Sequence, residues 1–340
     1  MAKAVQTMLL ATAVLTCGAR AGDEPKKIGP YGAEVRVAWT PDGKGLVVTT
    51  RGGSAAVIDL ENGRRRTRLD GEPEESESAV AISPDGSLFA LANLEGRVRI
   101  FDKAGKQLVV VNNGGPVKSL AFTHDGKALV TGGGVAPGMG ADADPEDPEA
   151  KDPEASDPEG ATARVWDAAT GEKLMDLDGK AKNTASGVAA SPTAGIVAVA
   201  RQDGKLGLWD LAQKKKRELE LGEPSHVVAF SPDGKLLAAL GGKDKAAATL
   251  VDTATGEVVR TVGPRADGGP DGALAFSRDG KLLARAGHGV AGVELWSVAE
   301  GKLVKTVGHD AAASLAFSPD GKTLAVGLRS GEVLLHPVGE

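Results

Sequence analysis

The side chains that most often carry chemistry are scarce in this sequence and are not grouped. Of 340 residues, five are histidines and one is a cysteine, Cys17. No two histidines have the spacing of zinc ligands, and neither a His-Glu-x-x-His segment nor a Gly-x-Ser-x-Gly segment occurs. A single cysteine excludes a disulfide within the chain and a thiolate metal cluster. The sequence therefore predicts no catalytic residue, no bound metal and no cofactor.

Two histidines are nevertheless candidates for binding a partner. His226 and His309 each come just before an apolar run that we predict to be the first strand of a repeated unit. His124 lies in a predicted turn, and His336 takes the place of a tryptophan found in other units, so we interpret both as structural or solvated. Residues that converge on a common axis could still form a site that no linear motif reveals.

An acidic segment at residues 135–160 is the other candidate for binding. It holds four Asp-Pro-Glu triplets, and its nine acidic residues against one lysine give a net charge of −8. Five prolines and the absence of apolar periodicity predict a disordered chain extended by self-repulsion. We name Asp144, Glu146, Asp147 and Asp152 as candidate contacts for a basic partner. The alternatives are a merely solvated loop, or calcium binding without the glycine of an EF-hand loop.

The first 21 residues have the pattern of a secretory signal. Lys3 is followed by an uncharged apolar stretch and then by Ala19-Arg20-Ala21, a small-x-small cleavage site. We expect export to the periplasm or the exterior, with an uncleaved membrane anchor as the alternative, and no membrane span after cleavage. The mature chain would keep 38 of 40 basic residues and all 46 acidic ones, net −8. This charge disfavours nucleic acid as a partner.

A four-residue tag recurs seven times through the rest of the chain and has the composition of a turn. Its form is Ser-Pro-Asp-Gly or close to it, and the fourth copy, Ser191-Pro192-Thr193-Ala194, is degenerate. Pro presets the first central φ, Asp bonds to the backbone ahead of it, and Gly accepts positive φ. The aspartates of the other six copies are Asp42, Asp85, Asp125, Asp233, Asp279 and Asp320.

The tags are spaced as the turns of a repeated four-stranded sheet. Their third positions are separated by 43, 40, 68, 40, 46 and 41 residues, and the long step contains the acidic segment. Short apolar runs before and after each tag predict a hairpin of strands a and b. A third run, strand c, follows 17 residues after the third tag position, and a more polar strand d comes next. Strand c carries a Trp-Asp dipeptide at Trp166-Asp167 and Trp209-Asp210.

This pattern resembles the WD-repeat (WD40) family of β-propellers over residues 22–340. The resemblance implies an all-β, seven-bladed propeller of four-stranded antiparallel blades. Gly308-His309 is the one Gly-His pair that stands ahead of a predicted strand a, so the family's His–Ser–Trp–Asp hydrogen-bond tetrad is largely missing. In this family the face that carries the b–c and d–a loops commonly receives partners. His226, His309 and the acidic segment, a b–c loop of the third blade, would all lie on that face.

The strand count predicts how the ring closes. Seven a–b–c sets are present but only six d strands follow one, so the last d strand should come from around residues 24–29. Deleting residues 22–32 should then destabilise the whole ring in thermal melts. We expect a monomeric, non-catalytic scaffold for an unknown protein partner; the alternative is a propeller enzyme, of hydrolase or lactonase type, with its site at the central channel.

Overall fold

The computed structural model describes residues 25–339 except 30, 32, 52, 71–76, 134–161, 179–184, 223, 242–246, 264–271, 288–291 and 309–310. Within these residues the regular structure is all β, in 28 strands. None of the described segments is a helix long and apolar enough to cross a membrane. The expected signal at residues 1–21 and the acidic segment at residues 135–160 lie outside the described residues.

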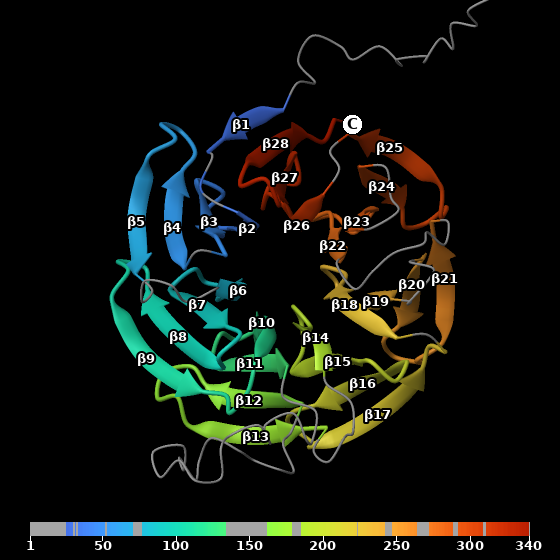
Figure 1. Cartoon of the computed structure of the whole chain (residues 1–340). Helices are drawn as coiled ribbons and strands as arrows, with labels where there is room; N and C mark the ends of the chain where they lie inside the picture. Colours follow the sequence, from blue (N-terminus) through green and yellow to red (C-terminus); the bar gives the residue numbers. More distant parts are fainter. Residues whose placement is uncertain are drawn as a thin grey trace, which may run out of the picture.

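The strands form seven antiparallel four-stranded sheets arranged around one axis (Figure 1). Blade 1 consists of β2 (Arg36–Trp39), β3 (Gly45–Thr49), β4 (Ser54–Asp59) and β5 (Arg65–Asp70). Blade 2 consists of β6 (Glu77–Ile82), β7 (Leu88–Asn93), β8 (Arg97–Asp102) and β9 (Gln107–Asn112). Blade 3 consists of β10 (Val117–Phe122), β11 (Ala128–Gly133), β12 (Ala163–Asp167) and β13 (Lys173–Leu177). Blade 4 consists of β14 (Ala185–Ala190), β15 (Ile196–Arg201), β16 (Lys205–Asp210) and β17 (Lys215–Glu220).

The remaining three blades repeat this order. Blade 5 consists of β18 (Ser225–Phe230), β19 (Leu236–Gly241), β20 (Ala247–Asp252) and β21 (Val258–Val262). Blade 6 consists of β22 (Gly272–Phe276), β23 (Leu282–Gly287), β24 (Val293–Ser297) and β25 (Leu303–Val307). Blade 7 consists of β26 (Ala312–Phe317), β27 (Thr323–Leu328), β28 (Val333–Pro337) and β1 (Lys26–Ile28). The prediction of a seven-bladed all-β propeller is confirmed.

The ring is closed by the N-terminal strand. β1 pairs antiparallel with β28, with Lys26 opposite Leu335 and Ile28 opposite Val333, and so becomes the outermost strand of blade 7. Ile28 is buried in the same apolar cluster as Val333 and Leu46 of blade 1. Closure therefore covers an edge of β28 that would otherwise be unpaired, and it joins the last blade to the first.

The apolar core lies between blades rather than within them. Seven buried clusters are found among the described residues, and each is shared by two neighbouring blades. In the cluster between blades 2 and 3, for example, Ile100 packs with Leu129 and Trp166. Val, Leu and Ala form most of these clusters, as the low aromatic content requires. One blade alone cannot bury its faces, so the stability of each depends on both neighbours.

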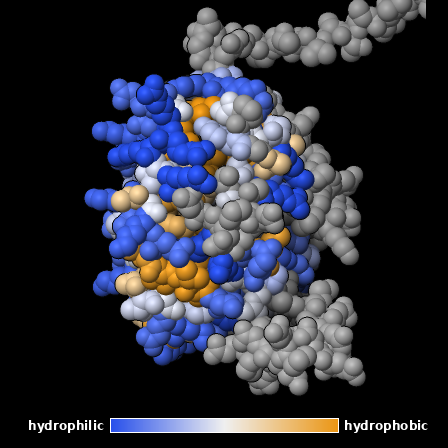
Figure 2. Space-filling view, turned by 60° about the vertical axis from the view of Figure 1, so that its left-hand side comes forward, coloured by the Kyte–Doolittle hydropathy of each residue, from blue (hydrophilic) through white to orange (hydrophobic). Residues whose placement is uncertain are grey.

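The outer rim is mostly polar, with apolar side chains on several outermost strands. Figure 2 brings the β5 and β9 side of the ring forward and shows an apolar patch among hydrophilic side chains. The exposed apolar residues of β9 include Leu108 and Val110. The neighbouring outer strand β5 instead carries Arg65, Arg66 and Arg68. Charges on the outer strand discourage pairing with another sheet edge.

Candidate functional site

A hollow opens at one end of the propeller axis, where the innermost strands of several blades meet. Its volume is about 390 Å³. The residues around it come from the starts of the a strands and from the ends of the b strands, so it lies on the face of the b–c and d–a connections. The sequence predicted this as the face for a partner.

One repeated backbone position supplies much of the wall. Five a strands contain a β-bulge at their second residue, where the ladder to strand b skips one residue. A bulged residue is unpaired in the ladder, and its side chain is re-aimed. All five bulged residues line the hollow: Ser78, Lys118, Ser186, His226 and Ala313. The fold thus presents a different side chain from each blade at one structural position.

A second repeated position completes the rim. It lies nine residues after the third position of the tag, one or two residues past strand b, and four of its occupants line the hollow: Arg51, Leu94, Gln202 and Arg329. Leu94 is 43% exposed and offers an apolar contact beside these polar groups. The hydroxyl of Ser186 is buried and makes no hydrogen bond with any residue that the structure describes. The exposed side chains of Lys118 and Gln202 are polar groups of the hollow that a ligand can engage.

The lining is positively charged although the chain as a whole is acidic. Among the lining residues four are Lys or Arg and only Glu34 is acidic. Glu34 accepts ion pairs from two arginines, Arg51 at 3.3 Å and Arg36 at 3.6 Å. Lys118, on the opposite part of the ring, has no ion pair with a described residue. Among the described lining residues one carboxylate is shared by two guanidinium groups, which leaves these residues with a net positive charge.

The arginine side of the hollow is fixed by the seam where the ring closes. The amide of Glu34 donates to the carbonyl of Arg329 at 3.0 Å, and the amide of Arg329 donates to Ala311 at 3.1 Å. Glu34 and Ala311 both adopt positive φ, at 52° and 67°. Non-glycine residues hold that conformation only where the surroundings enforce it. Closure between blades 7 and 1 therefore also positions the charged wall.

The structure describes only one of the two candidate histidines. His226 lines the hollow, but it is the second residue of β18 rather than a residue ahead of the strand. The reason is the bulge between Ser225 and Val227, which extends the a strand through this residue. His309 lies outside the described residues. That His226 binds a partner stays a prediction.

The acidic candidates Asp144, Glu146, Asp147 and Asp152 also lie outside the described residues. The residues that flank the segment are described: the amide of Gly133, at the end of β11, donates to the carbonyl of Thr162 at 3.0 Å. Gly133 and Thr162 therefore mark a b–c connection of blade 3 on the face of the hollow. Its role in binding stays a prediction.

Neither His124 nor His336 belongs to the hollow. His124 is exposed in an a–b turn on the opposite face, and His336 is buried in β28. Among the described residues no three His, Cys, Asp or Glu side chains gather as metal ligands would.

The tag aspartates organise the a–b turns. In each of the six complete tags the Ser or Thr hydroxyl donates to the Asp carboxylate at 2.5–2.7 Å. The same carboxylate accepts the amide two residues ahead at 3.0–3.1 Å. These hydrogen bonds lower the carboxyl pKa in all six, and that of Asp85 falls to about 2. The lining of the axial hollow includes none of these six residues, so they are placed as turn formers.

The Trp-Asp dipeptides stabilise turns and blade seams. Asp167 accepts the amides of Ala169 and Thr170 in the c–d turn of blade 3, and these bonds lower its pKa. Asp210 accepts the amide of Gln213 in blade 4. The indole of Trp166 donates to Thr131 at 3.1 Å, and the Thr131 hydroxyl donates to Asn113 at 2.7 Å. This short chain of hydrogen bonds ties the loop after blade 2 to blade 3.

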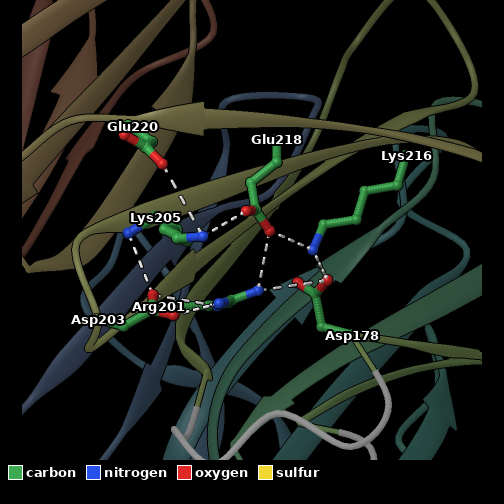
Figure 3. A network of polar contacts seen from close by, with 7 residues as sticks. All are labelled: Asp178, Arg201, Asp203, Lys205, Lys216, Glu218 and Glu220. Atoms are coloured by element: carbon green, nitrogen blue, oxygen red, sulfur yellow. Dashed lines mark hydrogen bonds and ion pairs between the residues drawn. The ribbon is translucent and has the colours of Figure 1, made fainter.

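Sequence reasoning missed two buried charged clusters. In blade 6, Glu294 accepts hydrogen bonds from Arg285 and from the Trp296 indole, both at 2.8 Å. Arg285 is 1% exposed, and its guanidinium lies over the Trp296 ring at 5.8 Å. Charged residues at inward positions of the a–b–c pattern, as in Leu-Leu-Ala-Arg-Ala-Gly, were the available signal. The second cluster surrounds Asp178 in blade 4 (Figure 3).

Comparison with known proteins agrees with this architecture. A model described as "Eukaryotic translation initiation factor eIF2A" matches residues 203–328. The chain is 30% identical over 102 residues to the U3 small nucleolar RNA-associated protein 18 homolog of Arabidopsis thaliana, across 29% of this chain and 19% of that protein. The Cps50 (Swd1) β-propeller domain of Myceliophteria thermophila superimposes with a TM-score of 0.73 at 15% identity, covering 93% of this chain and 100% of that domain.

The chain has a β-propeller fold of the WD40 type. The structural likeness extends over nearly all of this propeller, whereas the chain spans about a fifth of the length of the curated relative that it matches. The matches identify the fold; they do not identify what this propeller binds. The propeller fold expected from the repeated tags is confirmed.

Proposed function

We propose that this WD40-type propeller is a non-catalytic scaffold that binds another protein at its hollowed face. The observation that carries the proposal is the wall of the hollow. Five bulged residues and four residues after strand b place different side chains around one opening. Because the blades are fixed to one another by shared cores, such a surface binds without losing much conformational freedom.

The compartment and the oligomeric state belong to the same proposal. Residues 1–21 have the composition of a secretory signal, so we propose that the propeller acts as a monomer after export. N-terminal sequencing of the exported product should begin near Gly22. An unprocessed N-terminus would favour the anchored alternative.

Site-specific crosslinking in cells tests the binding face. A benzoylphenylalanine at Leu94, on the rim of the hollow, should capture a discrete protein on illumination. The matched control places it at Leu174 on the outer strand β13, where exposure is similar, 51% against 43%. Capture at Leu94 should disappear when Ala313→Trp fills the hollow without changing its charge.

Two results would overturn the proposal. One is capture of the same protein from Leu174 as from Leu94. The other is capture at Leu94 that persists in the Ala313→Trp variant while that variant melts like the parent.

A further inference from the structure

The charges around the hollow indicate what kind of partner segment it takes. Arg36 and Arg51 stand on blade 1, Arg329 on blade 7 and Lys118 on blade 3. Glu34 is the one acidic residue among the lining residues. Cations distributed over three blades match a ligand with several separated negative charges better than a single compact anion.

We infer that the hollow binds an acidic polypeptide segment of the partner, with its carboxylates on Arg51, Lys118 and their neighbours. This inference rests on the proposed function and specifies the chemistry of the same site. Guanidinium groups pair with carboxylates through two parallel hydrogen bonds, and the Lys118 ammonium offers a charge that no described residue neutralises. Complementary charge of this kind chiefly raises the association rate and selects the partner.

The polar and apolar lining fits a peptide better than a nucleic acid. The exposed Gln202 side chain can hydrogen-bond to a peptide backbone, and Leu94 with Val227 can contact an apolar side chain. Single-stranded nucleic acid is held largely by stacking of bases on aromatic rings. The lining contains no Phe, Tyr or Trp, so the feature that would favour bases is missing from the described wall.

Fluorescence anisotropy with the mature chain tests the inference. The probes are labelled deca-glutamate, deca-glutamine and a ten-residue oligothymidylate. We expect deca-glutamate to bind and deca-glutamine not to bind. The double variant Arg51→Glu/Lys118→Glu should weaken binding of deca-glutamate by about tenfold, since two attractive pairs become repulsive.

A matched control separates local from overall charge. Lys127→Glu/Lys322→Glu makes the same change of charge at exposed positions in a–b turns on the opposite face. It should leave affinity for deca-glutamate within about twofold, because those sites lie beyond effective screening distance from the hollow. Binding should also weaken as salt rises from 50 to 200 mM.

Three outcomes would overturn the inference: equal binding of deca-glutamine, equal loss in both double variants, or tighter binding of the oligothymidylate than of deca-glutamate. Failure here is distinguishable from failure of the proposed function. Suppose that crosslinking at Leu94 is abolished by Ala313→Trp but unaffected by Arg51→Glu/Lys118→Glu. The proposed scaffold function then stands, and the inference of an acidic partner segment is wrong.

Discussion

Blades 3 and 4 carry the same Trp-Asp dipeptide in the same place, yet they bury it in different ways. In blade 3 the Trp166 indole donates to Thr131, which donates to Asn113, so these three neutral side chains are bonded to one another. The buried Arg164 guanidinium lies beside them, where it donates to the Asn113 carbonyl and pairs with Asp176 at 3.3 Å. In blade 4 the strand register puts Val199 at the place of Thr131. The indole nitrogen of Trp209 is buried with no hydrogen-bond partner among the described residues.

Blade 4 holds its seam with charges instead. Asp178 follows β13 as Asn113 follows β9, and its carboxylate is fully buried. It forms ion pairs with Lys216 and, at 3.9 Å, with Arg201 (Figure 3). Glu218 lies beside both cations, at 3.2 Å from Arg201 and 2.9 Å from Lys216. A Trp-Asp dipeptide therefore fixes a strand and a turn, but not the polar network behind them.

The turns of blade 3 keep the residues of the repeat, whereas those of blade 4 do not. Blade 3 has a complete tag, and Gly171 occupies the positive-φ position of its c–d turn. Blade 4 has Thr193 and Ala194 in the tag, and Lys214 adopts φ of 53° at the equivalent turn position. Blade 4 thus departs from the repeat in its polar network, its tag and its c–d turn. Comparing blades 3 and 4 therefore tests what each of these features contributes to stability.

The largest expected effect comes from breaking the ionic seam. Asp178→Ala should lower the free energy of unfolding by about 3 kcal/mol, because it leaves two largely buried cations with one fewer carboxylate. Glu220→Ala is the matched control, since this outer member of the network is 80% exposed and pairs with Lys205 at 3.9 Å. It should cost less than about 0.5 kcal/mol in the same urea titrations. Equal costs would show that burial of Asp178 does not matter.

Breaking the hydrogen-bond chain from Trp166 through Thr131 to Asn113 in blade 3 should give the next largest loss of stability. Thr131→Val should cost about 2 kcal/mol in urea unfolding, because the Trp166 indole and the Asn113 side chain both lose a buried hydrogen bond. The reverse change in blade 4, Val199→Thr, should alter stability by less than about 1 kcal/mol, as the new hydroxyl gains the Trp209 indole as a donor while being buried itself. If the two substitutions lower the free energy of unfolding equally, this hydrogen-bond chain contributes nothing specific to blade 3.

These two clusters also mark where prediction from sequence ends. The tags Thr40–Gly43 to Ser318–Gly321 follow local turn chemistry, and the runs beside them follow local periodicity, so strands, blade number and closure by residues 26–28 were all predictable. Asn113 and Asp178 were not, because each acts across a seam on residues of the next blade. A lone Asn or Asp gives no sign of a partner in the next blade. Arg285 differs, since its partner Glu294 lies on the next strand of the same blade and its inward strand position was a signal.

The hollow was predictable only in part. Strand order placed His226 on the face where the structure has it, since b–c and d–a connections share that face. The cationic wall was missed because Lys118, Arg51 and Arg329 occupy two repeat positions that no motif connects. Aligning the residue before the a-strand core across all seven units would have revealed the first of these positions. The bulges that aim it inward follow from no local signal in the sequence.

Substitutions in the c–d turns of the two blades should have smaller effects on stability, and these effects should be opposite in sign. Lys214→Gly should raise the free energy of unfolding by about 1 kcal/mol by relieving a positive φ that a side chain disfavours. In blade 3, Gly171→Ala should be destabilising, because a Cβ there would approach Val109 Cγ1 to 2.6 Å as well as straining φ. Thermal melts of the two variants should move in opposite directions. A stabilised Gly171→Ala variant would contradict this account of the turn.

The smallest effect should come from completing the tag of blade 4, and it should depend on pH. Thr193→Asp with Ala194→Gly installs the hydrogen bonds that lower the pKa of Asp85 to about 2 from an ordinary value of 3.8. A carboxyl whose pKa is lower in the folded state stabilises the fold above pH 4, and this contribution is lost as pH falls from 4 to 2. Because these carboxylates lie in solvent, we expect a gain of about 0.5 kcal/mol at pH 7. Urea unfolding of parent and variant at pH 7 and pH 2 checks it: the gain should be present at pH 7 and largely gone at pH 2. An equal gain at both values would mean that the new glycine, rather than the carboxylate, stabilises the turn, and Ala194→Gly alone separates the two.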